Sequence, residues 1–270
     1  MSKKKNDALG SRMKEYYEQI PKIKLTRRIP VILRIDGKAF HTFTRGFDKP
    51  FDRVLMKSMQ QTMKSLCKEI QGCVFGYTQS DEITLLLVDY QSLNASAWFD
   101  YEVQKMCSIG ASMATLYFNK HFSDNVKAFI ETEGSGEKAH LVKVYKNALN
   151  KGALFDCRCF NIPKEEVTNC IYWRQQDATR NSIQMVGHAN FSQDRLNGKS
   201  CNEIQDMLHE EKGINWNDFP IDCKRGSACY KVTINDRSAW LIDGNMPILK
   251  TTPECDYRQY VEQWINFEES

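Results

Sequence analysis

The chain has 270 residues, a hydrophobic fraction of 41% and a formal net charge of +3, so we expect one large domain with a substantial core. No apolar run approaches the roughly 20 residues of a membrane span. No apolar segment follows Lys3-Lys4-Lys5, which argues against a secretory signal, and Asp7, Glu15 and Glu18 argue against an acid-poor transit peptide. We therefore expect a cytoplasmic protein.

The ten cysteines are scattered along the chain. Cys157 and Cys159 are the only close pair and no Cys-x-x-Cys occurs, so neither a zinc site nor a disulfide framework is predicted. Reduced thiols in a cytosolic protein explain these cysteines better.

Positive charge is concentrated in two stretches. Residues 1–30 hold nine Lys/Arg and three acids, residues 138–180 hold eight basic and four acidic residues, and the tail from Glu254 holds five acids and one Arg. Clustered positive charge is typical of proteins that bind a polyanion. A solvated, lysine-rich surface would explain these counts equally well.

The elements are predicted in chain order from apolar periodicity and from residues that start or stop helices. Residues 31–36 form a short, β-branched run typical of a buried strand, which ends in Asp36 and Gly37. The further predictions are a short helix at 11–19, a loop at 40–51, a helix from the N-cap Asp52 to Ile70, hairpin strands at 73–77 and 83–88, a helix at 96–122, a mobile loop at 124–138 and a strand at 154–162.

The predicted order β-α-β-β-α-β indicates an α+β fold with a ferredoxin-like core, in which two helices cover one face of an antiparallel sheet. We expect a basic lead-in at 1–30, this core at 31–162 and a mostly helical extension at 163–270. In the extension, helices are predicted at 164–178, 180–190 and 201–212, and a β-ribbon at 227–234 and 239–242.

Two carboxylates are expected to meet at one edge of the sheet. Asp36 ends the first strand, and Asp81 lies at the hairpin tip with Glu82 beside it. Two aspartates at adjacent strand ends could hold Mg²⁺ in a two-metal site for nucleotidyl transfer. The alternative is that Asp36-Gly37 is only a turn and Asp81 a solvated hairpin tip.

Three further features could bind phosphate or RNA. The backbone N–H groups of Gly37, Lys38, Ala39, Phe40 and His41 could form an anion-binding nest, and Lys49 and Lys105 are candidate phosphate ligands, although most lysines are solvated. The stretch 172–182 combines aromatic, Arg and amide side chains suited to RNA contact, or alternatively is a core Trp within a polar helix surface. His188 and His209 are expected to be ordinary histidines, and no P-loop is present.

Four motifs, taken together and in this order, resemble the tRNAHis guanylyltransferase family, and more closely its tRNA-repairing branch of 3′–5′ RNA polymerases. They are Arg34-x-Asp36-Gly37-Lys38-x-Phe40-His41-x-Phe43, Phe47-x-Lys49-Pro50, Gln79-Ser80-Asp81-Glu82 and Trp173-Arg174-Gln175. The resemblance spans about residues 30–190.

This resemblance implies a palm-like catalytic core, a homotetramer built as a dimer of dimers, and an extension used for tRNA binding and assembly. It implies two Mg²⁺ ions on Asp36, the Gly37 carbonyl and Asp81, with Glu82 as a further catalytic residue. Triphosphate contacts would fall on residues 37–41, Lys49 and Ser80, with Lys105 as a further nucleotide-binding lysine. Arg34, Arg174, Arg180 and Asn181 are the candidate tRNA contacts.

The implied reaction starts from the 5′ end of tRNA, where ATP adenylylates the 5′-monophosphate. The 3′-hydroxyl of GTP or another NTP then displaces AMP. Thr179 stands where the tRNAHis-specific branch has a histidine, which favours template-dependent repair of the acceptor stem of truncated tRNAs. Addition of a single guanosine to tRNAHis is the alternative, and a non-catalytic RNA-binding protein is an alternative of another class.

Overall fold

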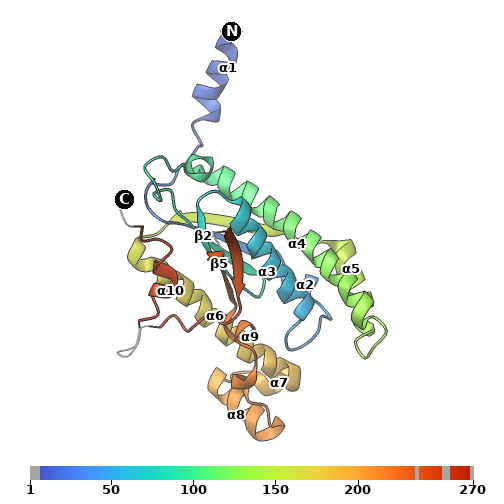
Figure 1. Ribbon diagram of the computed structural model, residues 1–270. Coiled ribbons are helices and arrows are strands. Elements are labelled where there is room, and N and C mark those ends of the chain that lie inside the picture. Colours follow the sequence, from blue (N-terminus) through green and yellow to red (C-terminus); the bar gives the residue numbers. More distant parts are fainter. Residues whose placement is uncertain (1–6, 235–236, 251–255, 268–270) are drawn as a thin grey trace.

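A computed structural model describes residues 7–234, 237–250 and 256–267 (Figure 1). Lys3-Lys4-Lys5 and part of the acidic tail lie outside the described residues. The six strands are β1 (Val31–Gly37), β2 (Cys73–Gln79), β3 (Glu82–Leu87), β4 (Phe155–Asn161), β5 (Ser227–Ile234) and β6 (Arg237–Asp243). They form one sheet of order β4-β1-β3-β2-β5-β6, in which all neighbours are antiparallel. The predicted α+β class is confirmed, and the predicted ribbon extends the same sheet.

The helices are α1 (Ala8–Met13), α2 (Phe40–Phe43), α3 (Arg53–Glu69), α4 (Val103–Glu133), α5 (His140–Lys151), α6 (Lys164–Asn190), α7 (Gln193–Leu196), α8 (Cys201–Lys212), α9 (Ile221–Arg225) and α10 (Gln259–Glu262). Shorter 3₁₀ or π turns are η1 (Lys14–Glu18), η2 (Trp98–Tyr101) and η3 (Trp216–Asp218). Within the described residues, no helix is long and apolar enough to span a membrane.

The sheet separates two apolar layers. Helices α3 and α4 cover one face, where Leu33, Leu66 and Phe118 belong to the larger core cluster and are fully buried. Helix α6 covers the other face with a smaller cluster that includes Ile32 and Ile171 (Figure 1). Burial of these apolar side chains is the main force that holds the helices on the sheet.

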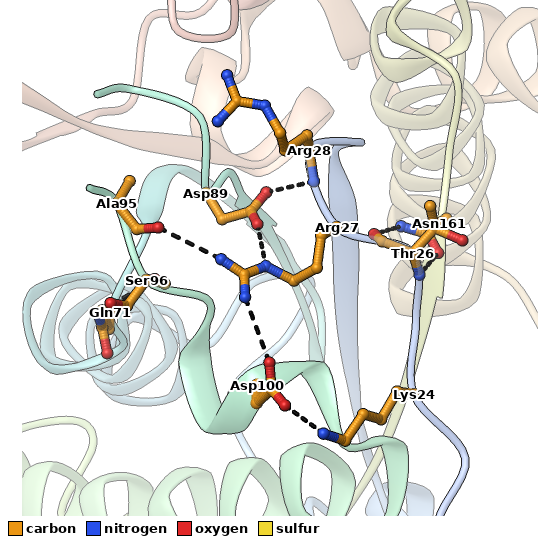
Figure 2. A network of polar contacts seen from close by, with 10 residues as sticks. All are labelled: Lys24, Thr26, Arg27, Arg28, Gln71, Asp89, Ala95, Ser96, Asp100 and Asn161. Carbon is orange, nitrogen blue, oxygen red and sulfur yellow. Dashed lines mark hydrogen bonds and ion pairs between the residues drawn. The ribbon is translucent and has the colours of Figure 1, made fainter. Parts of the chain in front are cut away.

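Leu25 of the lead-in packs against the larger core cluster, and a network of polar contacts also ties the lead-in to the body (Figure 2). The Arg27 guanidinium contacts the buried Asp89 carboxylate and the exposed Asp100, and Lys24 also contacts Asp100. The backbone N–H of Arg28 donates to Asp89 at 2.8 Å. This network fixes the chain just before it enters β1.

Several predictions of secondary structure were wrong, and the predicted loop at 40–51 contains the short helix α2. Helix α4 continues to Glu133 instead of ending at Phe122, because Val126 and Phe129 remain buried and Asn125 bonds to Ser58 on α3. The predicted mobile loop is thus mostly helix, and it is followed by α5, which was not predicted. Helix α6 is likewise one helix and not two, since its buried residues continue past Thr179.

Candidate active site

The hairpin between β2 and β3 places Asp81 against the end of β1. The Gly37 N–H donates to the Asp81 carbonyl at 3.1 Å, and Asp36 pairs in register with Glu82. A Cβ on Gly37 would lie 2.2 Å from the Phe40 ring, so the close packing at this strand end requires glycine. The tip of the hairpin and the end of β1 are therefore held side by side, as predicted.

The environment of Asp81 favours its neutral form. Burial, followed by the charge of Asp36, raises the pKa of Asp81 to about 6, and Ser80 Oγ donates to Asp81 Oδ1 at 3.1 Å. A shift of this direction shows that the two carboxylates interact in a poorly solvated place. A cation bound between them would relieve their mutual repulsion.

The oxygen atoms that these residues offer decide whether they suit Mg²⁺. Two carboxylates and the carbonyl of Gly37 are hard oxygen ligands, and Mg²⁺ is commonly held by one or two carboxylates with substrate phosphates and water completing its octahedron. Within the described residues no group of three or more His, Cys, Asp or Glu could hold a metal ion. The two carboxylates and the carbonyl oxygen are of the donor type that Mg²⁺ prefers.

Glu82 and Arg174, both predicted at the site, have a structural role that the sequence did not reveal. The Arg174 Nε donates to Glu82 Oε1 at 2.7 Å, and both side chains are about 7% exposed. Arg174 also binds Asp177 at 2.8 Å. Glu82 and Arg174 thus engage each other in the interior, and the catalytic role of Glu82 and the tRNA contact of Arg174 stay predictions.

A cavity of about 550 Å³ opens beside Asp81. It is lined by residues of β1, α2, the loop before α3, α3 itself, the hairpin tip and α6, namely Gly37, Ala39, Phe40, His41, Thr44, Phe47, Asp48, Lys49, Pro50, Asp52, Leu55, Ser80, Asp81, Met185 and His188. Cavities of this size commonly hold one small ligand. The structure thus gathers most of the predicted nucleotide-binding residues around one space.

The loop of residues 37–41 contributes less backbone to this cavity than predicted. The N–H of Gly37 donates to Asp81 and that of Lys38 donates to the Leu154 carbonyl at 2.8 Å. Ala39 has a left-handed conformation with φ 54° and precedes the short helix α2. Any anion contact from this backbone would therefore come from Ala39, Phe40 and His41.

The loop that carries Lys49 is fixed from α5 and its preceding turn. Asp52 caps α3 by accepting from Leu55 N at 2.8 Å, and it also accepts from Asp48 N at 2.9 Å and Tyr145 OH at 2.7 Å. Lys138 forms an ion pair with Asp48 at 2.5 Å. Burial raises the pKa of Asp52, while the bonds from these donors oppose the shift.

Three predicted contacts lie away from this cavity. Lys105 is near the start of α4, with its Nζ 5.0 Å from the centroid of Phe99. Gly37 pairs with Phe155 on β4, and the Phe155 N–H donates to Thr115 Oγ1 of α4 at 3.2 Å, so Thr115 lies at the level of Gly37. Lys105 is closer to the start of this helix, about 15 Å from Thr115 along its axis. Arg180 is exposed and paired with Asp177, and Asn181 lines a smaller cavity beyond Ser80. The nucleotide contact expected from Lys105 is not supported by this geometry.

Four residues near the site were missed. Met185 and His188 reach the cavity from α6, although His188 was expected to be an ordinary histidine. Asp156 and Arg158 of β4 pair in register with Asp36 and Arg34. Asp156 and Arg158 are alternate residues of a predicted strand, so the sequence already indicated that their side chains share one face of the sheet.

Comparison with known proteins identifies the family of this chain. Residues 10–163 match the family described as tRNAHis guanylyltransferase. A bacterial tRNAHis guanylyltransferase-like protein in complex with ATP is 40% identical, with a TM-score of 0.79 over 96% of this chain and 100% of that chain. The tRNAHis guanylyltransferase of Schizosaccharomyces pombe is 27% identical over 79% of this chain and 78% of its own length. The Saccharomyces cerevisiae enzyme structure, 21% identical over 85% of this chain and 96% of its own with a TM-score of 0.59, shares the fold. The chain belongs to the tRNAHis guanylyltransferase family of nucleotidyltransferases.

Proposed function

We propose that this protein adds nucleotides in the 3′–5′ direction to the 5′ end of truncated tRNA, using the opposite strand of the acceptor stem as template. The observation that carries the proposal is the Asp36–Asp81 pair beside a cavity large enough for one nucleotide. The 5′-monophosphate would attack the α-phosphate of ATP and release pyrophosphate, and the 3′-hydroxyl of an incoming GTP or other NTP would then attack the adenylylated end and displace AMP.

In this proposal the chain's own groups hold the two reactants in place. Asp36, Asp81 and the Gly37 carbonyl would hold two Mg²⁺ ions, which supply charge neutralisation and activation of the attacking hydroxyl. Lys49, Ser80 and residues 39–41 line the cavity and would bind the triphosphate. Phe40, Phe47, Leu55 and Met185 give the same cavity an apolar part that suits a nucleobase. Positioning and charge stabilisation are the main contributions to phosphoryl-group transfer.

We also propose that residues 163–270 take part in tRNA binding and in assembly of a homotetramer, as the family resemblance implies. Thr179, which stands in place of the histidine of the tRNAHis-specific branch, favours repair over addition of a single guanosine. Light scattering would give the mass of the assembly, and a monomer at working concentration would contradict the tetramer.

The test is extension of a 5′-monophosphorylated, truncated tRNA with Mg²⁺, ATP and all four NTPs, resolved at single-nucleotide length. Extension that ends when the acceptor stem is fully paired supports the proposal. One guanosine added only to tRNAHis would support the alternative activity, and RNA binding without turnover would support a non-catalytic binder.

The matched variants are Asp36→Ala and Asp81→Ala, with Asp124→Ala as the control on an exposed part of α4. We expect at least about a thousandfold loss of extension for the first two, because each removes a carboxylate of the pair, and no loss for the control. Chelation of Mg²⁺ with EDTA should abolish wild-type extension. Activity retained in both site variants would contradict the proposal.

A further inference from the structure

Two arginines lie directly opposite each other on the face of the sheet that α6 covers. Arg34 of β1 pairs in register with Arg158 of β4, so their side chains share a face. Like charges in this arrangement are unfavourable. Nearby acids compensate only in part, because Arg34 Nε is 3.8 Å from Glu82 and Arg158 binds Asp156, itself more than half exposed, at 3.0 Å.

An exposed tryptophan lies beside this pair. All five tryptophans are within the described residues, and Trp173 on α6 is the exposed one, at 49% of its surface. The Arg34 Cζ lies 5.5 Å from its ring centroid and the Arg174 Cζ 4.3 Å. An exposed aromatic ring with guanidinium groups around it is the combination that proteins use to stack nucleobases and bind phosphates.

We call Arg34, Arg158 and Trp173 the Trp173 patch. Arg34 and Asp36 are alternate residues of β1, so they share one face of the strand about 7 Å apart. None of the three residues of the patch lines the nucleotide-sized cavity at Asp81. The patch and the cavity are therefore separate, and each has a residue at or next to the carboxylate pair: Asp81 lines the cavity, and Arg34 is two positions from Asp36 on β1.

Nucleotidyl transfer to RNA needs two reactants at the same carboxylates. The cavity of about 550 Å³ accommodates one nucleotide, and the RNA end must approach from elsewhere. We propose that the Trp173 patch binds this end: the Trp173 ring stacks on the terminal base, and Arg34 and Arg158 bind the adjacent phosphates. The inference rests on the proposed function and makes Trp173 a positioning residue for the RNA substrate.

The first experiment measures stacking without requiring turnover. A truncated tRNA carrying 2-aminopurine as its 5′-terminal base is titrated with wild type, Trp173→Ala and Trp173→Phe. We expect quenching of the fluorescence by wild type and Trp173→Phe, and loss of it in Trp173→Ala at saturating protein. An internal 2-aminopurine is the control. Equal quenching of the terminal base by Trp173→Ala would overturn the inference.

The second experiment measures extension kinetics at saturating NTP. Trp173→Ala should raise the KM for RNA roughly ten- to a hundredfold, the range expected for one base stacked on an aromatic ring, with the KM for NTP unchanged. Trp173→Phe should recover most of the loss. Leu93→Ala removes an apolar side chain that is 89% exposed in a loop, and it should have no effect.

Arg158→Ala tests the phosphate contact. The slope of log affinity for RNA against log salt should decrease by about one, and an unchanged slope would remove Arg158 from the patch. Wild type that extends RNA while Trp173→Ala behaves identically would overturn this inference alone. Terminal quenching that depends on Trp173 in a protein without extension activity would support the inference while the proposed function fails.

Discussion

The two faces of the sheet differ in how they use the same strands. On the face of α3 and α4, β1 presents Val31, Leu33 and Ile35, all fully buried. On the face of α6, it presents Ile32, Arg34 and Asp36, which become more polar and more exposed toward the strand end. Because side chains alternate along a strand, one short segment supplies both a core and a reactive edge.

This difference shows how charged groups are kept at the end of a buried strand. The face of α3 and α4 carries the larger apolar core, while the face of α6 holds, beside its smaller apolar cluster, carboxylates whose repulsion would otherwise oppose folding. The Glu82–Arg174 pair removes one of these charges from the site, and Asp36 and Asp81 are left to interact with each other. If this interpretation is correct, variants on the two faces should separate stability from activity.

The largest expected effect on stability comes from the apolar face. Leu66 of α3 is fully buried in the larger core cluster, and Leu66→Ala should lower the free energy of unfolding by about 3–5 kcal/mol through lost burial and a cavity. Leu116 of α4 is 65% exposed, so Leu116→Ala is the matched control and should change the free energy of unfolding by less than about 0.5 kcal/mol. Denaturant unfolding measures both. Similar losses in the two variants would contradict the assigned core.

The buried ion pair on the polar face gives the next effect. Arg174→Ala should destabilise the protein by about 3 kcal/mol, because it leaves the Glu82 carboxylate buried without its partner. Adding Glu82→Gln to this variant should recover much of the loss. The double-variant cycle is measured by denaturant unfolding, and purely additive losses would show that the two residues do not act as a pair.

Helices and strands could be predicted from the sequence where the signal lies in neighbouring residues. The run 31–36, the hairpin around Asp81 and the cap at Asp52 each depend on neighbouring residues, and the structure confirms them. The second half of α4 was missed although its buried residues Phe122, Val126 and Phe129 continue at helical spacing, because the polar residues between them and Gly134-Ser135-Gly136 indicated a loop. Its burial becomes evident only when Asn125 meets Ser58, 67 positions earlier in the chain.

The site was predictable to a similar extent. The meeting of Asp36 and Asp81 followed from strand order alone, whereas the burial of Arg174 depends on a partner 92 residues away. His188 reaches the cavity because α6 continues unbroken past Thr179. Long-range contacts of this kind leave no periodic pattern in a single sequence.

The two ends of the strands also differ, because the cavity lies at one end and not at the other. Lys49 lines the cavity and Lys105 does not, so Lys49→Ala should raise the KM for NTP about tenfold, which corresponds to about 1.4 kcal/mol. Lys105→Ala is the matched control and should leave this KM unchanged. Extension rates measured over a range of NTP concentrations test both. A larger effect of Lys105→Ala would place the nucleotide elsewhere or bring in another subunit.

The smallest effect concerns Asp52, a carboxylate buried on the mostly apolar side. Its pKa is raised chiefly by burial, so the folded state keeps the proton at pH values where the unfolded carboxyl, with a pKa of about 3.9, has lost it. The folded state then binds more protons, and stability should fall as the pH rises from about 4 through the raised pKa. Asp52→Asn retains a capping side chain and should reduce this fall, whereas Asp124→Asn, at an exposed position, should not. Unfolding free energies measured between pH 4 and 7 decide the matter, since an identical pH dependence in Asp52→Asn and wild type would show that Asp52 is fully ionised in both states.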